Sequence, residues 1–278
     1  MFSNPYGKYP VAQVSSRRIE QARRKRQGIV MIAGCGVVLA AMIGGVVWSM
    51  KGSRDSVSGC LKSHKAGVRH VALSDRTDRL KPVEQDLLVS GLQSLAAQIA
   101  TEDRLTVVAF DGNADVPAKP LFDRCRPSDG NDVSPWFSTP ARAEKRFRDG
   151  FQVPLDAALK QAAEGGSARE THLVAFLGGL AASLKYQAKA ESVVIHVFSD
   201  MAENTPAGSF LPGKKSKPFD AAGFTMYVRQ LTGGRLAGVE IKVHALSTSG
   251  GAAAGKRIKE AWSEALTANG VRFNWGSL

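Results

Sequence analysis

The sequence contains no charged residue from Gly28 to Met50, and this is its most informative absence. An uncharged, mostly apolar run of 23 residues has about the length that an α-helix needs to cross the hydrocarbon core of a bilayer. The run also lacks a clear small-x-small cleavage site before Lys51, so we expect an uncleaved anchor and not a removed signal peptide. The sequence therefore predicts a transmembrane helix over residues 28–50.

Outside its first 27 residues the chain has no long basic run and no aromatic residues interleaved with cations, although its formal net charge is +12. Residues 1–27 contain seven Lys and Arg against one acid, Glu20, and carry half of the excess charge. The other half is spread over a far longer surface, so we expect no nucleic-acid binding. By the positive-inside rule, residues 1–27 form a cytoplasmic tail at the inner or plasma membrane. Residues 51–278 then lie in the periplasm or outside the cell.

Cysteine is scarce, with three residues in the chain. Cys35 lies within the predicted membrane helix, whereas Cys60 and Cys125 follow that helix. In an oxidising envelope compartment these two residues either form a disulfide or remain free thiols, and the sequence favours neither alternative.

The sequence lacks the local motifs that identify common hydrolases. It contains no Gly-x-Ser-x-Gly nucleophile elbow and no phosphate-binding loop. Haloacid-type phosphatases require a second Asp two residues after the first, but Thr77 occupies that place after Asp75. We therefore expect no enzyme. A metal-dependent envelope hydrolase, in which Asp75 or Asp200 activates water, is the alternative.

Beyond the predicted membrane helix the chain shows no internal repeat and no low-complexity segment. Residues 51–67 are rich in Ser, Gly and Lys and indicate a short tether, and residues 68–278 indicate one α/β domain. Strands and helices alternate with short returns, so we expect a Rossmann-like, doubly wound, mostly parallel sheet. Apolar patterns predict strands near residues 70–73, 105–110, 193–198 and 239–246, and helices near residues 82–100, 173–184, 224–231 and 258–266.

Two of the predicted strands lead directly into an acidic loop. The apolar run 70–73 is followed by Asp75 and Thr77, and the run 193–198 is followed by Asp200. The carboxyl ends of parallel strands lie at the same edge of a sheet, so we expect these side chains to lie at one rim. Oxygen donors two residues apart on one loop can both face a hard cation such as Mg²⁺. The first loop is thus predicted to supply half of a metal site, with the other half coming from later loops.

The order of these strands and loops resembles the von Willebrand factor A (vWA) domain over residues 68–275. In that family a metal-ion-dependent adhesion site combines an Asp-x-Ser-x-Ser loop, a Thr from a second loop and an Asp after the fourth strand. The resemblance places Asp75 and Thr77 in the first loop, Thr171 as the separate Thr and Asp200 as the last Asp. It implies Mg²⁺, with Mn²⁺ as the alternative, and a protein partner whose carboxylate completes the metal shell. By itself, Thr171 is equally well explained as the N-cap of the helix that follows.

One position departs from the vWA pattern, because Arg79 stands where the second Ser is expected and Asp78 precedes it. A guanidinium cannot bind a cation and repels one. Either Arg79 points away and Asp78 or water takes its place, or the ion is absent and Arg79 pairs with Asp75 or Asp200. The sequence leaves a metal-bearing site and a degenerate, metal-free site as open alternatives.

Together these observations favour a membrane-anchored vWA-like protein-interaction module that acts in a bacterial envelope complex. Its work would be binding and not turnover. The hydrolase described above is one alternative. Another is a metal-free structural subunit of a membrane complex, in which the predicted helix 28–50 assembles with other helices through its glycines.

Overall fold

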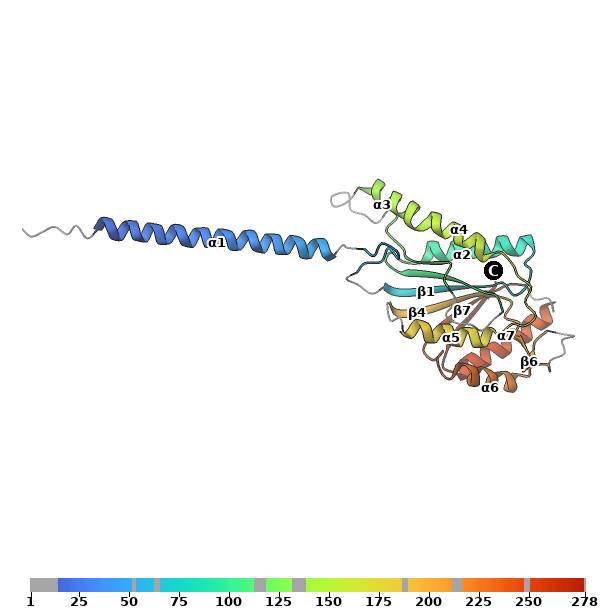
Figure 1. Cartoon of the computed structure of the whole chain (residues 1–278). Coiled ribbons are helices and arrows are strands. Elements are labelled where there is room, and N and C mark those ends of the chain that lie inside the picture. Colours follow the sequence, from blue (N-terminus) through green and yellow to red (C-terminus); the bar gives the residue numbers. More distant parts are fainter. Residues whose placement is uncertain are drawn as a thin grey trace, which may run out of the picture. The chain divides into compact units, whose positions relative to one another are not determined.

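The computed structural model describes residues 15–51, 54–62, 66–112, 119–131, 139–186, 190–211, 217–247 and 251–277. The chain divides into two compact units, Met1–Ser53 and Arg54–Leu278. Figure 1 shows a long helix in the first unit and a layered α/β domain in the second.

The described part of the first unit is a single helix, α1 (Ser15–Lys51). Its segment Arg23–Gly45 has a mean hydropathy of 2.2 and is long and apolar enough to cross a membrane. The helix begins well before Gly28, so part of the predicted basic tail is helical. The physical reason is that Arg, Lys, Gln and Ala, which dominate residues 17–26, are strong helix formers.

The second unit contains a six-stranded sheet with the strand order β3-β2-β1-β4-β7-β8. Strands β1, β2, β4, β7 and β8 run parallel to one another, and β3 pairs antiparallel with β2 at one edge. This arrangement confirms the prediction of a doubly wound, mostly parallel α/β sheet. A separate two-stranded ladder joins β5 and β6. The strands are β1 (Ala66–Asp75), β2 (Arg104–Phe110), β3 (Phe122–Cys125), β4 (Ala190–Ser199), β5 (Asn204–Thr205), β6 (Gly208–Ser209), β7 (Glu240–Ala245) and β8 (Arg272–Ser277).

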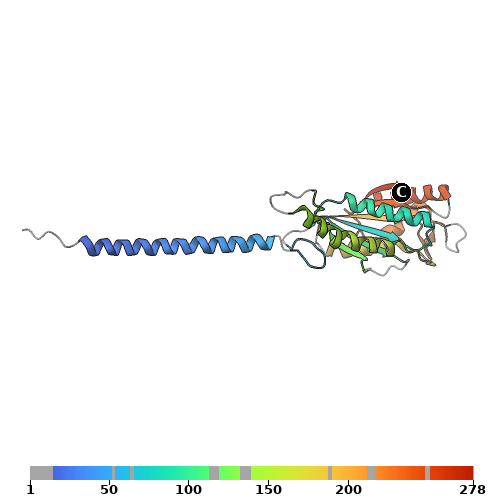
Figure 2. The ribbon, with the colours of Figure 1, turned by 90° about the horizontal axis from the view of Figure 1, so that it is seen from above.

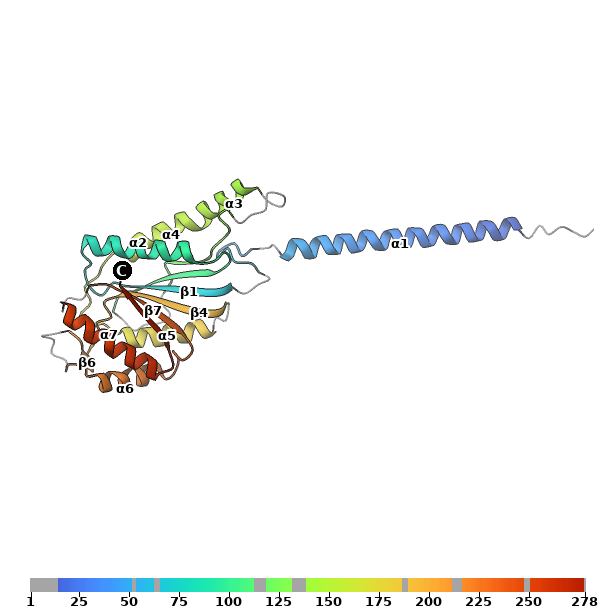
Figure 3. The same cartoon turned by 180° about the vertical axis from the view of Figure 1, so that it is seen from behind.

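Helices cover both faces of the sheet, as Figures 1, 2 and 3 show from three directions. Helices α2 and α4 pack on one face, and α5, α6 and α7 pack on the other. The helices are α2 (Pro82–Gln98), α3 (Pro140–Phe147), the π-helical segment η1 (Arg148–Gln152), α4 (Val153–Ala162), α5 (Leu173–Tyr186), α6 (Ala221–Thr232) and α7 (Gly251–Ala268).

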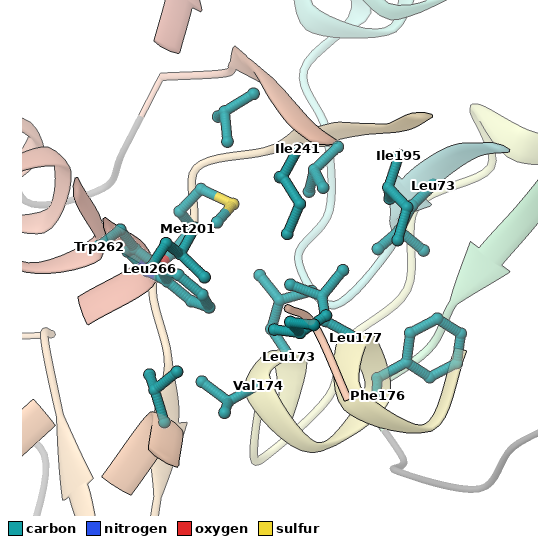
Figure 4. Close-up of a cluster of buried hydrophobic side chains, with 14 of the residues drawn as sticks. Leu73, Leu173, Val174, Phe176, Leu177, Ile195, Met201, Ile241, Trp262 and Leu266 are labelled. Atoms are coloured by element: carbon teal, nitrogen blue, oxygen red, sulfur yellow. The ribbon is translucent and has the colours of Figure 1, made fainter. Parts of the chain in front are cut away.

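Side chains along β1 point alternately to the two faces of the sheet, so β1 contributes to both hydrophobic cores. Leu73 points to the α5 side, whereas its neighbour Ala72 belongs to the cluster formed with α2 and α4. Figure 4 shows the first core, in which strand residues meet residues of α5 and the fully buried Trp262 of α7. Fully burying a Leu, Ile, Val or Phe side chain stabilises the fold by about 1.5–3 kcal/mol relative to leaving it exposed. The two cores therefore hold the strands and their ends in place.

Residues 54–62, which follow helix α1, are held to the α/β domain by two contacts. Arg54 forms a salt bridge of 2.5 Å with Glu102, and a disulfide joins Cys60 to Cys125 of β3. The second compact unit begins at Arg54, inside the segment 51–67 that the sequence indicated to be a tether. The disulfide is one of the two alternatives that the sequence left open for Cys60 and Cys125.

Candidate functional site

The candidate site lies where the strand order of the sheet reverses. Strand β1 lies between β2 and β4, and the chain passes from β1 to β2 on one side of the sheet and from β4 to β7 on the other. Ser74 of β1 is in register with Phe198 of β4, so the ends of these two strands lie side by side. In open α/β sheets this switch point at the carboxyl ends of the strands is where ligands commonly bind.

Asp75 is the last residue of β1 and is almost fully buried. Its Oδ1 accepts hydrogen bonds from the amide and the hydroxyl of Thr77, at 2.9 and 2.7 Å. Its Oδ2 accepts a bond of 2.5 Å from the hydroxyl of Ser199, the last residue of β4. Burial raises the pKa of the Asp75 carboxyl, and these hydrogen bonds partly offset that effect.

The loop after β1 is held by its neighbours. The carbonyl of Thr77 accepts a bond of 2.7 Å from the Ala168 amide. Gly112, at a φ of +94°, lies against this loop, and a Cβ there would be 2.6 Å from the Glu170 carbonyl oxygen. Only glycine fits this close approach, so the loops that follow β1, β2 and α4 are packed together at one edge.

Asp78 and Arg79 are both exposed, unlike Asp75 and Thr77. Among the described residues, no salt bridge joins Arg79 to Asp75 or Asp200. The described residues therefore show no contact that corresponds to the alternative in which Arg79 pairs with Asp75 or Asp200.

Asp200 follows β4 and lies at the same edge as Asp75. Its Oδ1 accepts a hydrogen bond of 3.0 Å from the Ala202 amide, and this bond closes a local turn. The next residue, Met201, has a φ of +60°, a conformation that non-glycine residues rarely adopt. The indole of Trp262 donates a hydrogen bond of 2.8 Å to the Met201 carbonyl. The Met201 amide donates a hydrogen bond of 2.8 Å to the Ser199 hydroxyl. The backbone beside Asp200 is thus strained and clamped from both sides.

Thr171 is buried, with 7% of its surface exposed. It is held through its backbone, which exchanges bonds of 2.7 and 3.2 Å with Asn204. The sequence suggested that Thr171 caps the following helix, but α5 begins at Leu173, and its first amides bond to the carboxyl of Glu203 instead. Glu203, which is distant in sequence, thus caps α5 in place of Thr171.

Three residues of this edge were not predicted as part of the site from the sequence, namely Ser199, Glu203 and Asn204. Ser199 had a usable signal, because it is the last residue of a strongly apolar strand and immediately precedes Asp200. Glu203 and Asn204 had none, since they stand in a polar run whose burial depends on the packing of α5 and α6.

The four histidines among the described residues divide into two groups. His172 is partly exposed and lies 2.8 Å from the carboxylate of Glu170. Three others form a chain across the sheet, in which the ring nitrogens of His70 and His196 are 3.2 Å apart and those of His196 and His244 are 3.2 Å apart. Burial, together with the charges of the neighbouring histidines and Lys242, lowers the pKa of His196 to about 3. His196 is buried and His244 is half-buried, so this row of imidazoles belongs to the packed sheet.

The donor types at the edge suit a hard cation. Carboxylate and hydroxyl oxygens from Asp75, Thr77, Thr171, Ser199 and Asp200 come from three loops, and Mg²⁺ prefers such oxygen ligands. Thr77 can donate its proton to Asp75 while a lone pair of the same oxygen faces a cation. In the described residues, no cluster of three or more His, Cys, Asp or Glu side chains is arranged to hold a metal ion. A cation at this edge would therefore depend on hydroxyl groups as well as on acids.

The chain matches no family model and no curated protein. Among solved structures, it is similar to the conserved hypothetical protein BatB from Bacteroides thetaiotaomicron, with 10% identity over 76% of this chain and 90% of that chain and a TM-score of 0.38. It is also similar to an aerotolerance-related membrane protein from Bacteroides fragilis NCTC 9343 carrying multiple mutations to serine, with 13% identity over 76% of this chain and 91% of that chain and a TM-score of 0.31. These likenesses are too distant to show a family.

Proposed function

We propose that this protein is a membrane-anchored, vWA-like binding module that recognises a protein partner at the loops following β1 and β4. The observation that carries the proposal is the meeting of Asp75, Thr77 and Ser199 at the switch point of the sheet. A buried acid aligned by two hydroxyl groups, with further oxygen donors on adjacent loops, is a preformed polar site for a ligand.

A divalent cation, Mg²⁺ or Mn²⁺, is part of this proposal. Among the described residues, Asp75 has hydroxyl and amide donors as its hydrogen-bond partners and takes part in no salt bridge. Such a buried carboxylate is stabilised when a cation approaches. Asp75, Thr77, Thr171 and Asp200 would hold the ion, and a carboxylate of the partner would complete its shell.

The location follows from two features. Helix α1 contains a segment suited to a membrane, with the basic residues on its N-terminal side. The disulfide between Cys60 and Cys125 is of the kind that persists in oxidising compartments outside the cytoplasm. We therefore propose that the domain lies in the periplasm or outside the cell, in an envelope complex.

The test is calorimetric titration of the whole chain, in detergent micelles, with Mg²⁺ and Mn²⁺. We expect saturable binding to the wild-type chain, a loss of affinity of at least about tenfold, or 1.4 kcal/mol, in Asp200→Asn, and no change in the control Asp86→Asn. Asp86 is an exposed acid on α2 and matches the change in charge. Equal binding by wild type and Asp200→Asn would overturn the cation site and favour a metal-free binding surface.

The hydrolase alternative is separated by a second measurement on the same preparations. Phosphatase and peptidase assays with Mg²⁺ or Mn²⁺ should show no turnover above that of Asp75→Ala. Metal-dependent turnover that disappears in Asp75→Ala would replace the binding proposal with an enzyme.

A further inference from the structure

The two faces of the sheet are covered unequally at strands β7 and β8. On one face, the core under α5, α6 and α7 continues to Ile241 and Val243 of β7. Phe273 and Trp275 of β8 pack against the same core. On the other face, the core under α2 and α4 ends at Phe198 of β4 and, among the described residues, includes none of β7 or β8. Figure 1 shows α5, α6 and α7 on one side of the sheet and α2 and α4 on the other.

The second face of β7 and β8 is formed by polar side chains. Successive side chains of a strand point to opposite faces, so the residues between the apolar ones point away from α5, α6 and α7. In the sheet register, Glu240 lies beside Arg272, and Lys242 lies beside Asn274. Arg272 and Asn274 are exposed, whereas the residues of β7 are half-buried. We refer to the set as the β7–β8 surface, and it consists of Glu240, Lys242, His244, Arg272 and Asn274.

Helix α2 borders this surface with apolar side chains. The buried stripe of α2, which includes Leu88, faces the sheet, and Ala96 on one flank lines a groove shared with α4. Each residue advances about 100° around a helix, so Leu87 and Val83 lie on the opposite flank. Because α4 packs over β2 and β3, this flank of α2 faces β4 and β7. Leu87 is 41% exposed and Val83 is 67% exposed.

An uncovered face is unusual for a parallel sheet. Parallel strands occur almost only where both faces are covered, and β7 pairs parallel with β4 and with β8. The backbone groups of β7 are already bonded to these two strands, so they offer no hydrogen bonds to a segment lying on the face. A segment that covers the face must therefore satisfy its own backbone groups, and an α-helix does so.

The charges of the β7–β8 surface favour an acidic partner. The Lys242 ammonium lies 3.2 Å and the Arg272 guanidinium 3.8 Å from the carboxylate of Glu240, so two cations share one acid. Burial and the charge of Lys242 lower the pKa of His244, so this imidazole is neutral at pH 7. One positive charge of the surface is thus left for a carboxylate of a partner. A second copy of this chain would instead bring the same two cations against them.

We propose that an amphipathic helix of a partner protein docks on the β7–β8 surface, with acidic side chains toward Lys242 and Arg272 and apolar side chains toward Leu87. Such a helix completes the layer that α2 and α4 form on this face. The inference goes beyond the proposed function, because this surface is a face of the sheet, whereas the proposed cation site is formed by loops at its edge.

Photo-crosslinking of the whole chain, in the cells that produce it, tests the inference. The crosslinking residue p-benzoylphenylalanine is placed at Asn274 in one strain and at Leu87 in another. We expect both positions to capture the same segment of one partner protein, and mass spectrometry to show that this segment has acidic and apolar residues at helical spacing. The control position is Met226, an exposed residue of α6 on the other side of the sheet, which should not capture this segment.

A charge reversal tests the electrostatic part of the proposal. Arg272→Glu, combined with the crosslinking residue at Leu87, places like charges together, so we expect the yield of the crosslinked complex to fall by about tenfold. The matched control is Arg257→Glu, which makes the same change at an exposed position of α7 and should leave the yield unchanged. A role of Arg272 in stability alone would not lower the yield in a chain that remains folded.

Several outcomes would overturn the inference. Capture of no protein from either position would show that the face stays in water. Capture of a second copy, or of a basic segment, would replace the acidic helix with another occupant. Equal yields with and without Arg272→Glu would remove the charge selection. If the chain carrying the crosslinking residue at Asn274 does not fold, the Leu87 position decides by itself, because it lies on a different element.

Discussion

The hydroxyl of Ser199 donates a hydrogen bond of 2.5 Å to the carboxylate of Asp75, although 124 positions separate the two residues in the chain. Each is the last residue of its strand, so the parallel pairing of β1 with β4 brings them together. The central acid of the site is therefore aligned by the sheet itself. Loop movements alone would not release it.

Replacing Ser199 by Ala should lower the free energy of unfolding by about 1–3 kcal/mol. The change leaves a buried oxygen of Asp75 and the amide of Met201 without their partner. Urea unfolding followed by circular dichroism measures the loss. The control is Ser90→Ala, which removes an exposed hydroxyl that bonds only within α2. A Ser199→Ala variant as stable as this control would show that the Asp75 contact contributes little.

Much of the fold was predictable from the sequence because local patterns and burial agree along the central strands. The apolar runs that became β1, β2 and β4 are largely buried on both faces, so they show as continuous hydrophobic segments, whereas β7 alternates between buried and half-buried residues. The acids at their ends follow from the same reasoning, since parallel strands place Asp75 and Asp200 at one edge. These features depend on short-range sequence and on one general rule of sheet topology.

The remaining parts of the site depend on contacts between distant segments. The capping of α5 by Glu203 was not predictable, because Thr171 stands at the expected position and has a suitable side chain. Likewise, the clamp of Trp262 on Met201 joins α7 to the Asp200 loop, and only the packed structure shows it. Sequence patterns identify which residues are polar near a strand end, but tertiary packing decides which of them become buried partners.

Removing the disulfide should destabilise the domain by about 4 kcal/mol, because the bridge closes a long loop and restricts the unfolded chain. The two cysteines are 65 positions apart in the sequence. Urea unfolding of Cys60→Ser and Cys125→Ser, with Cys35→Ser as the control, measures the effect. If reduction and both substitutions leave the midpoint unchanged, Cys60 and Cys125 are not bridged in solution.

Glu203 should make the domain less stable as the pH rises. Its pKa is about 8 in the folded protein and 4.5 when unperturbed, so the favourable protonated state is fully present below 4.5 and is lost as the pH rises through 8. Between these values the stability contributed by Glu203 falls by about 1.4 kcal/mol per pH unit. Unfolding titrations of wild type and Glu203→Gln should therefore diverge across this window, with the variant gaining relative stability at the higher pH. Parallel curves would contradict the burial of an ionisable group at this position.

His196 should act in the opposite direction, and its effect can be isolated in the same way. Its pKa is about 3 in the folded protein and 6.5 when unperturbed, so its stabilising neutral state is intact above 6.5 and is lost as the pH falls toward 3. The stability contributed by His196 falls by about 1.4 kcal/mol for each pH unit below 6.5. The stability contributed by Glu203 rises as the pH falls over an overlapping range. The two effects oppose each other, so the free energy of unfolding of the wild type should change little between pH 4.5 and 6.5.

Substituting His196 by Gln removes only the histidine contribution, so the variant should gain stability relative to wild type as the pH falls from 6.5. The range above 6.5 is an internal control, since the neutral histidine contributes no slope there and the two curves should run parallel. Urea midpoints at several pH values, in buffers of equal ionic strength, provide the comparison. A constant difference between wild type and His196→Gln through the acidic range would mean that the imidazole chain of His70, His196 and His244 is hydrated and takes up protons freely in the folded domain.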